Sequence, residues 1–349
     1  MKVFSTSLSI RISVASLLEQ KEDSKFTIHF HSDLNSKEVF TLYNNALVLD
    51  GGIAIIEMLY KSNVLALVGG GKNPKYTPNK VIIWDDYQSK VLNEFKFTSS
   101  VKNVKLKKDK IIVVCDQRIY VYHSQTYKSI DTIETFDNPK GIIGINTDLN
   151  STVLAYPENP KGFIKIKNYE KSTEISINAH ESEISFICIN PSATILATTN
   201  ENGSLVRIYD VQECHFIDEY KKSKGDINYM CFDQTTSWLA VAGDSGTIQI
   251  WSMSTVYQKL REKGQVNEED IPQDLPKNKT SVFSFLGFKN EKNFAQVKLE
   301  DEKSICGFAK DNTVIAISSL GKYYLSTIDT KKGGDCKITK EEDLNKKRY

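Results

Sequence analysis

The amino-acid sequence predicts an all-β protein, a seven-bladed WD40-like β-propeller. A short strand recurs along the chain, turn residues separate the neighbouring strands, and no long segment has helical periodicity. A repeat of about 40–45 residues with four strands per unit is typical of propeller blades.

The recurring strand is apolar and ends in a large side chain followed by a polar turn residue. Positions 43, 84, 122, 167, 209 and 251 mark its copies, and they lie 41, 38, 45, 42 and 42 residues apart. The copies are Phe40–Asn44, Val81–Asp85, Ile119–His123, Phe163–Asn168, Val206–Asp210 and Ile248–Ser252. In the fifth copy's unit, an Asn-Pro-Ser turn and a Glu-Asn-Gly turn separate the preceding strands, which predicts an antiparallel blade.

The first predicted strand lies in the N-terminal segment. Lys2, Arg11 and several serines with no acid before Glu19 resemble a targeting peptide. The apolar residues of Leu8–Val14 alternate with polar ones, however, and period-two alternation predicts a half-buried strand of the fold.

A seventh unit closes the array after an insertion. Ile305–Phe308, Val314–Ser318 and Tyr323–Ser326 repeat the strand rhythm. The step from Trp251 to Leu325 is 74 residues, which exceeds one repeat by about 30. We therefore expect a single propeller over 1–349, with a long hairpin-loop insertion in blade 6 at about 254–299 and a short polar tail at about 331–349.

Composition excludes several classes of protein. Forty-five basic and 44 acidic residues give a net charge of +1, which argues against a globally basic nucleic-acid binder. No apolar run reaches the roughly 18 residues of a spanning helix. The six cysteines form no C-x-x-C pair, so neither a disulfide framework nor a zinc knuckle is indicated. We expect a monomeric cytoplasmic protein that needs no cofactor and binds no nucleic acid.

Three motifs imitate catalytic or binding chemistry. Gly69-Gly-Gly-Lys72 is followed by Asn-Pro rather than by a helix, unlike a phosphate loop. Gly243-Asp-Ser-Gly246 resembles a serine-protease segment, but no histidine lies in a fitting context and a similar turn recurs at residue 201. Cys214 and His215 are adjacent on a predicted strand and point to opposite faces. The sequence predicts neither an enzyme nor a metal site.

Several longer segments carry a family resemblance. They are Glu57–Asp86, Asn138–Gly141, Ile177–Glu181, Ala197–Asp210 and Gly246–Ile250. Over residues 40–330 or so the chain resembles the PROPPINs, the β-propellers that bind polyphosphoinositides and are called WIPI proteins in animals. The resemblance implies an effector of phosphatidylinositol 3-phosphate or the 3,5-bisphosphate that docks on preautophagosomal, endosomal or vacuolar membranes. It also implies recruitment of autophagy machinery, with the autophagy lipid-transfer protein as a partner.

The resemblance also implies headgroup-binding residues. The family motif Phe/Leu-Arg-Arg-Gly lies between blades 5 and 6, where this chain has Tyr220-Lys-Lys-Ser-Lys-Gly225. Lysine is a hydrated point charge and lacks the bidentate fork of arginine. The first pocket is expected to comprise His180, Asn200, Ser204 and Lys221, and the second Lys222, Thr247 and Gln249 beside Ala242 and Gly243, where serines are common. Two roles stay open for His180, ligand or structural histidine.

The insertion contains a candidate membrane-insertion loop. Its large apolar residues are Val282, Phe283, Phe285, Leu286 and Phe288, and Lys277, Lys279 and Lys289 flank them. Burying such side chains in a membrane contributes roughly 1.5–3 kcal/mol each, as an upper bound. The alternative is that the phenylalanines pack against blade 6 or 7. The family uses this loop as a membrane anchor.

Two functions therefore stay open. One is a membrane-docking phosphoinositide effector, which the aromatic loop favours. The other is a protein-interaction scaffold that has lost most lipid binding, which the Lys-Lys pair and the altered second pocket favour.

Overall fold

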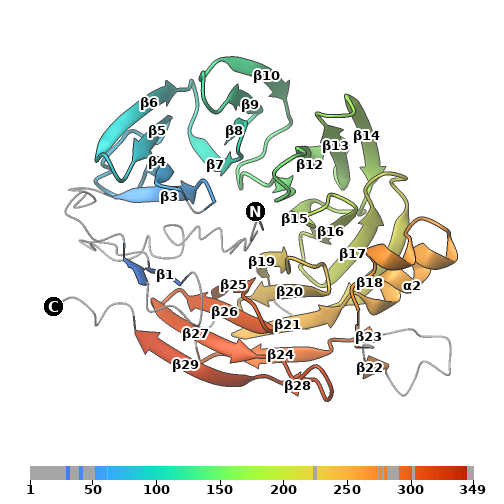
Figure 1. The fold of residues 1–349 in the computed structure, drawn as a ribbon. Helices are drawn as coiled ribbons and strands as arrows, with labels where there is room; N and C mark the ends of the chain where they lie inside the picture. Colours follow the sequence, from blue (N-terminus) through green and yellow to red (C-terminus); the bar gives the residue numbers. More distant parts are fainter. Residues whose placement is uncertain are drawn as a thin grey trace. The chain divides into compact units, whose positions relative to one another are not determined.

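The computed structural model describes residues 29–31, 39–41, 52–60, 62–222, 226–273, 275–276, 279–280, 291–300 and 303–343. These residues form six sheets of four or five strands and two two-stranded pairs, with one α-helix and one 3₁₀ turn. The all-β prediction is confirmed (Figure 1). Within the described part of the chain, no helix is long and apolar enough to cross a membrane.

The first compact unit extends to Gly141 and contains two complete sheets. Each sheet is an antiparallel meander in chain order, and the first strand of one sheet contacts the first strand of the next. The sheets consist of β3 (Ile53–Met58), β4 (Val64–Gly69), β5 (Lys80–Asp85) and β6 (Lys90–Lys96), and of β7 (Val101–Leu106), β8 (Lys110–Cys115), β9 (Arg118–His123) and β10 (Ser129–Glu134). A separate pair joins β1 (His29–His31) to β2 (Val39–Thr41).

The second compact unit, Ile142–Asp343, contains four sheets. The first two are β11 (Gly144–Ile145), β12 (Val153–Glu158), β13 (Phe163–Asn168) and β14 (Thr173–Asn178), then β15 (Ile184–Ile189), β16 (Ile195–Asn200), β17 (Leu205–Asp210) and β18 (Phe216–Lys221). The third is β19 (Ile227–Phe232), β20 (Trp238–Gly243), β21 (Thr247–Ser252), β24 (Ala295–Lys298) and β28 (Gly334–Asp335). The fourth is β25 (Ser304–Phe308), β26 (Thr313–Ser318), β27 (Lys322–Thr327) and β29 (Lys337–Asp343).

Within this unit the first strands of the sheets lie side by side, because β11 contacts β15, β15 contacts β19 and β19 contacts β25. Burial is highest in the second strands and lowest in the fourth strands. Strands β20 and β26 are buried along their full length, whereas β14 is mostly exposed. A strand covered on both faces reads as a continuous apolar run, which explains why the second strands of the blades show no alternation.

The repeated polar residue at the end of each third strand has a local role. Asp210 Oδ1 accepts the backbone N–H groups of Gln212 and Glu213 at 2.8 and 2.6 Å. Asn168 Oδ1 accepts two such N–H groups at 3.1 and 3.0 Å. Such Asx turns reverse the chain into the fourth strand. The predicted repeat is therefore confirmed at β5, β9, β13, β17 and β21.

The insertion and the C-terminal segment differ from the predictions. After β21 the chain forms helix α2 (Ser254–Glu262), the 3₁₀ turn Glu268–Asp270, β22 (Lys279–Thr280) and β23 (Glu291–Lys292) before the fourth strand β24. The expected polar tail contains β29, which pairs with β27 as the outer strand of the last sheet. Its residues are largely exposed, so a polar composition is compatible with a strand there.

Two smaller expectations also change. Cys214 and His215 do not lie on a strand, because Cys214 has φ 54° in the turn that precedes β18. Of the predicted strand Phe40–Asn44, β2 covers the first two residues and adds Val39. The predicted strand Leu8–Val14 lies outside the described residues.

Candidate functional site

Three of the predicted first-pocket residues meet at one end of the β15–β18 sheet. Asn200 ends β16, Ser204 precedes β17 and Lys221 ends β18. Leu205 and Lys221 are opposite each other in the β17–β18 ladder, and the N–H group of Lys222 donates to the Ser204 carbonyl at 3.0 Å. The Ser204 and Lys221 side chains are exposed. In this register Ser204 lies opposite Lys222, and Lys221 lies opposite Leu205.

Asn200 adds an amide side chain at this end of the sheet. Its backbone carbonyl accepts from Ser185 Oγ at 2.7 Å and from the Gly203 N–H group at 2.9 Å. Its side-chain Oδ1 is buried and has no hydrogen-bond partner among the described residues. Turning the amide would put its NH₂ group in the same place, where it could donate to an anion.

The His180 side chain is buried beneath this end of the β15–β18 sheet. The side chain is 3% exposed, and Nε2 lies 2.9 Å from Thr198 Oγ1. Burial, together with the nearby Arg207 cation, lowers the pKa of His180 to about 4, so the ring is neutral near pH 7. The backbone carbonyl of His180 contacts the position that a Cβ of Gly162 would occupy, and Gly162 has φ +85°. This geometry fits a structural histidine better than a ligand.

Arg207 is a cation that the sequence analysis did not select. It lies on β17 opposite Thr198 and Glu219. Its NH1 group donates to the Ala179 carbonyl at 2.8 Å and Nε bonds Glu219 Oε2 at 3.3 Å, with 29% of the side chain exposed. The signal for it in the sequence was an arginine inside an otherwise apolar strand. It provides a fixed guanidinium near His180.

The predicted second-pocket residues are more enclosed. Lys222 is 6% exposed and its Nζ donates to the Asp226 carbonyl at 3.3 Å. Gln249 is 7% exposed, and its Nε2 lies 3.5 Å from Asn293 Oδ1. Thr247 is half-buried at the start of β21, and Ala242 and Gly243 are buried at the end of β20.

The membrane-insertion residues Val282, Phe283, Phe285, Leu286 and Phe288 lie outside the described residues. The stem that leads to them is described. Strands β22 and β23 pair with each other, and β23 contacts β18. Helix α2 contacts β18 as well (Figure 1). Both ends of the insertion therefore lie against the strand that carries Lys221.

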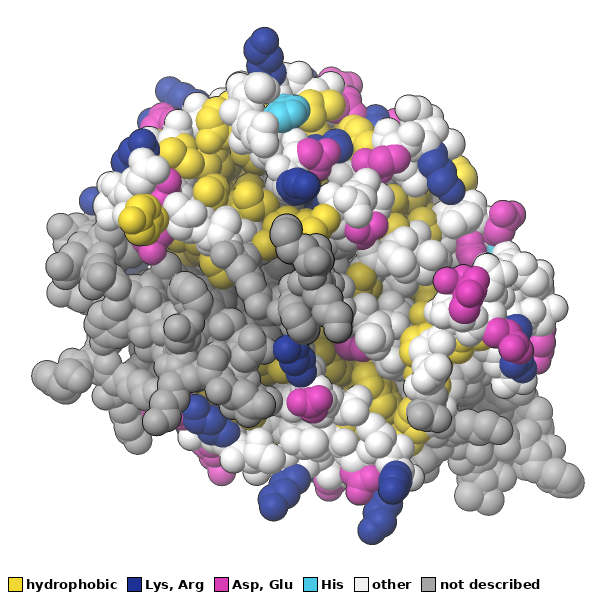
Figure 2. Space-filling view, viewed as in Figure 1, with side chains coloured by type: hydrophobic (Ala, Val, Ile, Leu, Met, Phe, Trp, Pro, Cys, Tyr) yellow, Lys and Arg dark blue, Asp and Glu magenta, His cyan; other side chains and the backbone are white. Residues whose placement is uncertain are grey.

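Charges at the surface are mixed. Figure 2 shows Lys and Arg side chains interspersed with Asp and Glu on the face that it displays. Among the described residues, no group of three or more His, Cys, Asp or Glu side chains could hold a metal ion. Burial raises the pKa of Cys115 and of Cys336 to about 11, which keeps those thiols protonated.

Comparisons with known proteins agree with the resemblance. The family model described as PROPPIN matches residues 43–345. Autophagy-related protein 18e of Arabidopsis thaliana is 30% identical over 296 residues, which are 82% of this chain and 75% of that protein.

Two solved structures show the same fold. Kluyveromyces lactis Hsv2 has a TM-score of 0.64 at 16% identity, over 84% of this chain and 87% of that one. The complex of KlAtg21 with the coiled coil of AgAtg16 gives 0.66 at 21% identity, over 84% and 86%. With the six four- or five-stranded sheets, these likenesses confirm the fold class of a seven-bladed WD40-like β-propeller.

Proposed function

The chain belongs to the PROPPIN family, and we propose that it is a non-enzymatic phosphoinositide effector that docks on membranes. Its ligand is phosphatidylinositol 3-phosphate or the 3,5-bisphosphate. On the membrane it recruits autophagy machinery, including the autophagy lipid-transfer protein. Its place of action is the cytoplasmic surface of preautophagosomal, endosomal or vacuolar membranes.

One observation carries the proposal, the cluster at the end of the β15–β18 sheet. An exposed ammonium (Lys221), an exposed hydroxyl (Ser204) and an amide (Asn200) lie together there, with the Arg207 guanidinium nearby. A phosphate monoester carries about −1.5 to −2 charges and three strong acceptor oxygens. Donors of these types form charge-assisted hydrogen bonds with such a group.

The insertion supports a second attachment. Phe283, Phe285 and Phe288 are spaced along a segment flanked by lysines, and each lysine near an anionic membrane contributes about 1 kcal/mol. The contacts of β23 and α2 with β18 bring the stem of this segment to the strand that ends in Lys221. Two modest attachments on one rigid unit raise the effective affinity without further contacts.

A protein-interaction scaffold is the second candidate function. The similar chain KlAtg21 is in complex with the coiled coil of AgAtg16, which supports a protein partner for this chain too. Lys222 is 6% exposed and its Nζ donates to the Asp226 carbonyl at 3.3 Å, which favours weak lipid binding. Under this alternative the protein joins partners without contacting the headgroup.

Liposome flotation separates the two functions. We expect the protein to float with vesicles that contain either phosphoinositide and to remain in the load fraction with vesicles that contain neither. The double variant Lys221→Ala, Lys222→Ala should lose this phosphoinositide-dependent flotation, because the cations at the end of β18 are removed.

The matched control is Lys331→Ala, Lys332→Ala. These adjacent exposed lysines lie in a turn whose backbone N–H groups bond Asp329, so the same charge is removed without loss of those bonds. The control should float like the wild-type protein. Absence of flotation for the wild-type protein on every vesicle would favour the scaffold.

A further inference from the structure

Three cysteines occupy the same register position in three neighbouring sheets of the second unit. Each lies on the first strand of its sheet and is paired with an alanine of the second strand. The pairs are Cys188 with Ala197, Cys231 with Ala240 and Cys306 with Ala316. Because β15 contacts β19 and β19 contacts β25, the three thiols come from strands that are neighbours in space.

Cys231 and Cys306 are in direct contact, although they are 75 residues apart in sequence. The Sγ atom of Cys231 donates to the backbone carbonyl of Cys306 at 3.5 Å, and the two residues are only 7% and 2% exposed. Both belong to one apolar cluster, together with Ala240 and Ala316. A hydrogen bond with the Cys306 thiol, together with burial, raises the pKa of Cys231 well above its usual value. The two side chains therefore meet as protonated thiols between two sheets.

Cys188 has the same register position but different surroundings. It is half-buried and packs against a different apolar cluster, the one that contains Trp251. Its Sγ atom lies 3.9 Å from the carbonyl oxygen of Ile189, the next residue of its own strand. The chain thus offers a matched control for the Cys231–Cys306 pair, a thiol at the same position whose sulfur contacts its own strand.

A pair of thiols in contact can undergo a reaction that a single buried thiol cannot complete. One thiolate attacks an oxygen of hydrogen peroxide, the O–O bond breaks, and one water leaves, which gives a sulfenic acid. The second thiol attacks that sulfur, the S–O bond breaks, and a second water leaves as the S–S bond forms. The pair loses two electrons and two protons, and one peroxide is reduced to two waters.

We propose that Cys231 and Cys306 are a redox modification site, which hydrogen peroxide converts to a reversible disulfide between β19 and β25. In a reducing compartment such bonds are transient and serve redox sensing. The bond would close a loop that contains helix α2 and the stem strands β22 and β23. Closing a long loop restricts the unfolded chain, so oxidation stabilises the folded protein. This inference goes beyond the proposed function and does not depend on lipid binding.

Peptide mapping of peroxide-treated protein tests the site. The reduced full-length protein is incubated with hydrogen peroxide, the remaining thiols are blocked with N-ethylmaleimide in denaturant, and a non-reduced digest is analysed by mass spectrometry. We expect two peptides joined through Cys231 and Cys306, lighter by two hydrogen atoms than the separate peptides. Dithiothreitol should release them. Because the wild-type protein is used, this readout does not depend on any variant folding normally.

Thermal unfolding detects the bond independently. Peroxide should raise the melting temperature of the wild-type protein by about 3 °C or more, and dithiothreitol should reverse the change. Cys306→Ala should show no increase, because Cys231 has lost its partner. Cys188→Ala, the matched control, should show the same increase as the wild-type protein.

The opposite results would overturn the inference. If Cys231 and Cys306 stay reduced at every peroxide concentration at which the protein remains folded, the pair only packs in the core, as buried cysteines commonly do. A dominant link between Cys188 and Cys231, a link found only between two molecules, or an equal rise in melting temperature for Cys306→Ala would exclude this pair as the site. Sulfinic acid without a link would show that the two sulfurs do not join. The proposed function is tested separately by flotation and stands or falls without these results.

Discussion

His180, which the resemblance places in the first pocket, has the surroundings of a structural histidine. It is held by Thr198 Oγ1, by the Gly162 carbonyl through its N–H group, and by nearly complete burial. A buried imidazole next to a guanidinium disfavours a second positive charge, and the pKa of His180 is therefore lowered to about 4. The neutral ring of His180 bonds Thr198 of β16 and lies near Arg207.

This lowered pKa predicts a pH-dependent stability. The unfolded chain protonates a histidine near pH 6.5, whereas the folded chain resists protonation down to about pH 4. Between these values the unfolded state binds more protons, so stability is full above pH 6.5 and falls as the pH decreases. The free energy of unfolding should drop by about 2 kcal/mol between pH 7.5 and pH 5 on account of this group.

Urea unfolding of the wild-type protein and His180→Gln at pH 7.5, 6.0 and 5.0 measures the effect. Glutamine is neutral throughout and can still bond Thr198. The variant should therefore show a smaller fall in stability with decreasing pH. Parallel curves for the two proteins would mean that His180 does not resist protonation in the folded state.

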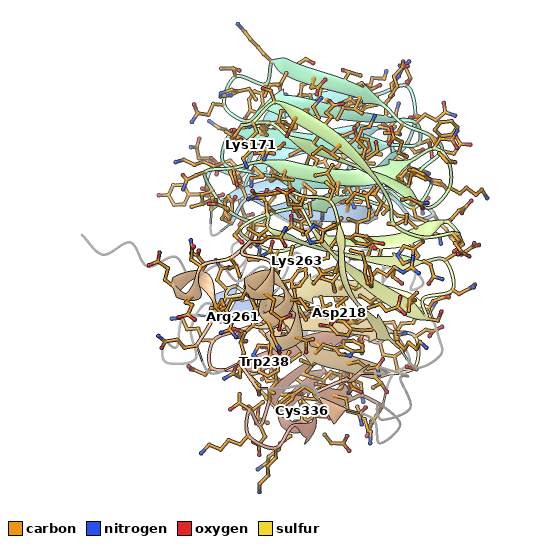
Figure 3. The ribbon with its side chains drawn as sticks, turned by 90° about the vertical axis from the view of Figure 1, so that its right-hand side faces the viewer. Lys171, Asp218, Trp238, Arg261, Lys263 and Cys336 are labelled. Carbon is orange, nitrogen blue, oxygen red and sulfur yellow. The ribbon has the colours of Figure 1, made fainter. Side chains whose placement is uncertain are left out.

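Helix α2 is an element that the sequence did not predict. Val256, Tyr257 and Leu260 are buried in the same core cluster as Tyr220 and Trp251, whose rings stack at 5.5 Å. Lys259 Nζ bonds Asp218 Oδ1 at 2.8 Å and the carbonyl of Ile217, a bulge residue of β18, at 3.1 Å. Figure 3 labels Arg261 on the helix and Asp218 on the neighbouring strand. The helix covers an outer strand whose edge would otherwise be open.

We expect Lys259→Met to reduce the free energy of unfolding by about 1–2 kcal/mol, because it leaves the Asp218 carboxylate and the Ile217 carbonyl without this donor. Asp218 has only 14% of its side chain exposed, so water replaces the lysine poorly. Denaturant midpoints and amide exchange in β18 measure the change.

Arg261→Met is the matched control on the same helix. Its ion pair with Glu268 spans 3.7 Å and both side chains are well exposed, at 55% and 87%. Exposed pairs contribute little, so the cost should stay below about 0.5 kcal/mol. Equal effects of the two substitutions would show that the Lys259 contacts do not attach α2 to β18.

At the scale of the whole molecule, the proposed function depends on two attachments to one membrane. The proposed headgroup cluster of Asn200, Ser204 and Lys221 lies at one end of the β15–β18 sheet, and the stem of the insertion contacts β18. The apolar segment carried by that stem can contribute several kcal/mol when it enters the interface, reduced by partial insertion and by ordering.

Replacing Phe283, Phe285 and Phe288 with serine should therefore lower flotation on phosphoinositide vesicles sharply, by ten-fold or more in apparent affinity. The melting temperature should change by less than about 2 °C, because the proposal has these rings in the membrane rather than in the protein core. Phe136→Ser, at a phenylalanine that is 60% exposed in the first unit, serves as the control. A large fall in melting temperature would show that the three rings belong to the core.

Much of the fold could be predicted from local sequence patterns. The third strand of each blade carries its own signal, an apolar run that ends in a side chain able to accept the turn's N–H groups, as Asp210 does. Burial on both faces makes the second strands uniformly apolar. The turn signal acts between residues close in the chain, and the apolar runs follow from burial alone. The repeat, the all-β class and the family resemblance were therefore predictable from the sequence. The single-propeller boundaries over 1–349 stay a prediction.

The tertiary structure decided what depends on contacts between distant segments. The place of the Lys222 ammonium depends on Gly243 at the end of β20, which has no side chain to collide with it, and on the Asp226 carbonyl four residues along the chain. The position of the Arg207 guanidinium depends on its hydrogen bond to the carbonyl of Ala179, which is 28 residues away in sequence. Helix α2 and strand β29 are short or polar, and each is stabilised by the strand against which it lies. Helix α2 has apolar residues at helical spacing but only nine residues in all, and β29 is mostly polar, so much of the energy that stabilises each comes from packing partners elsewhere in the chain.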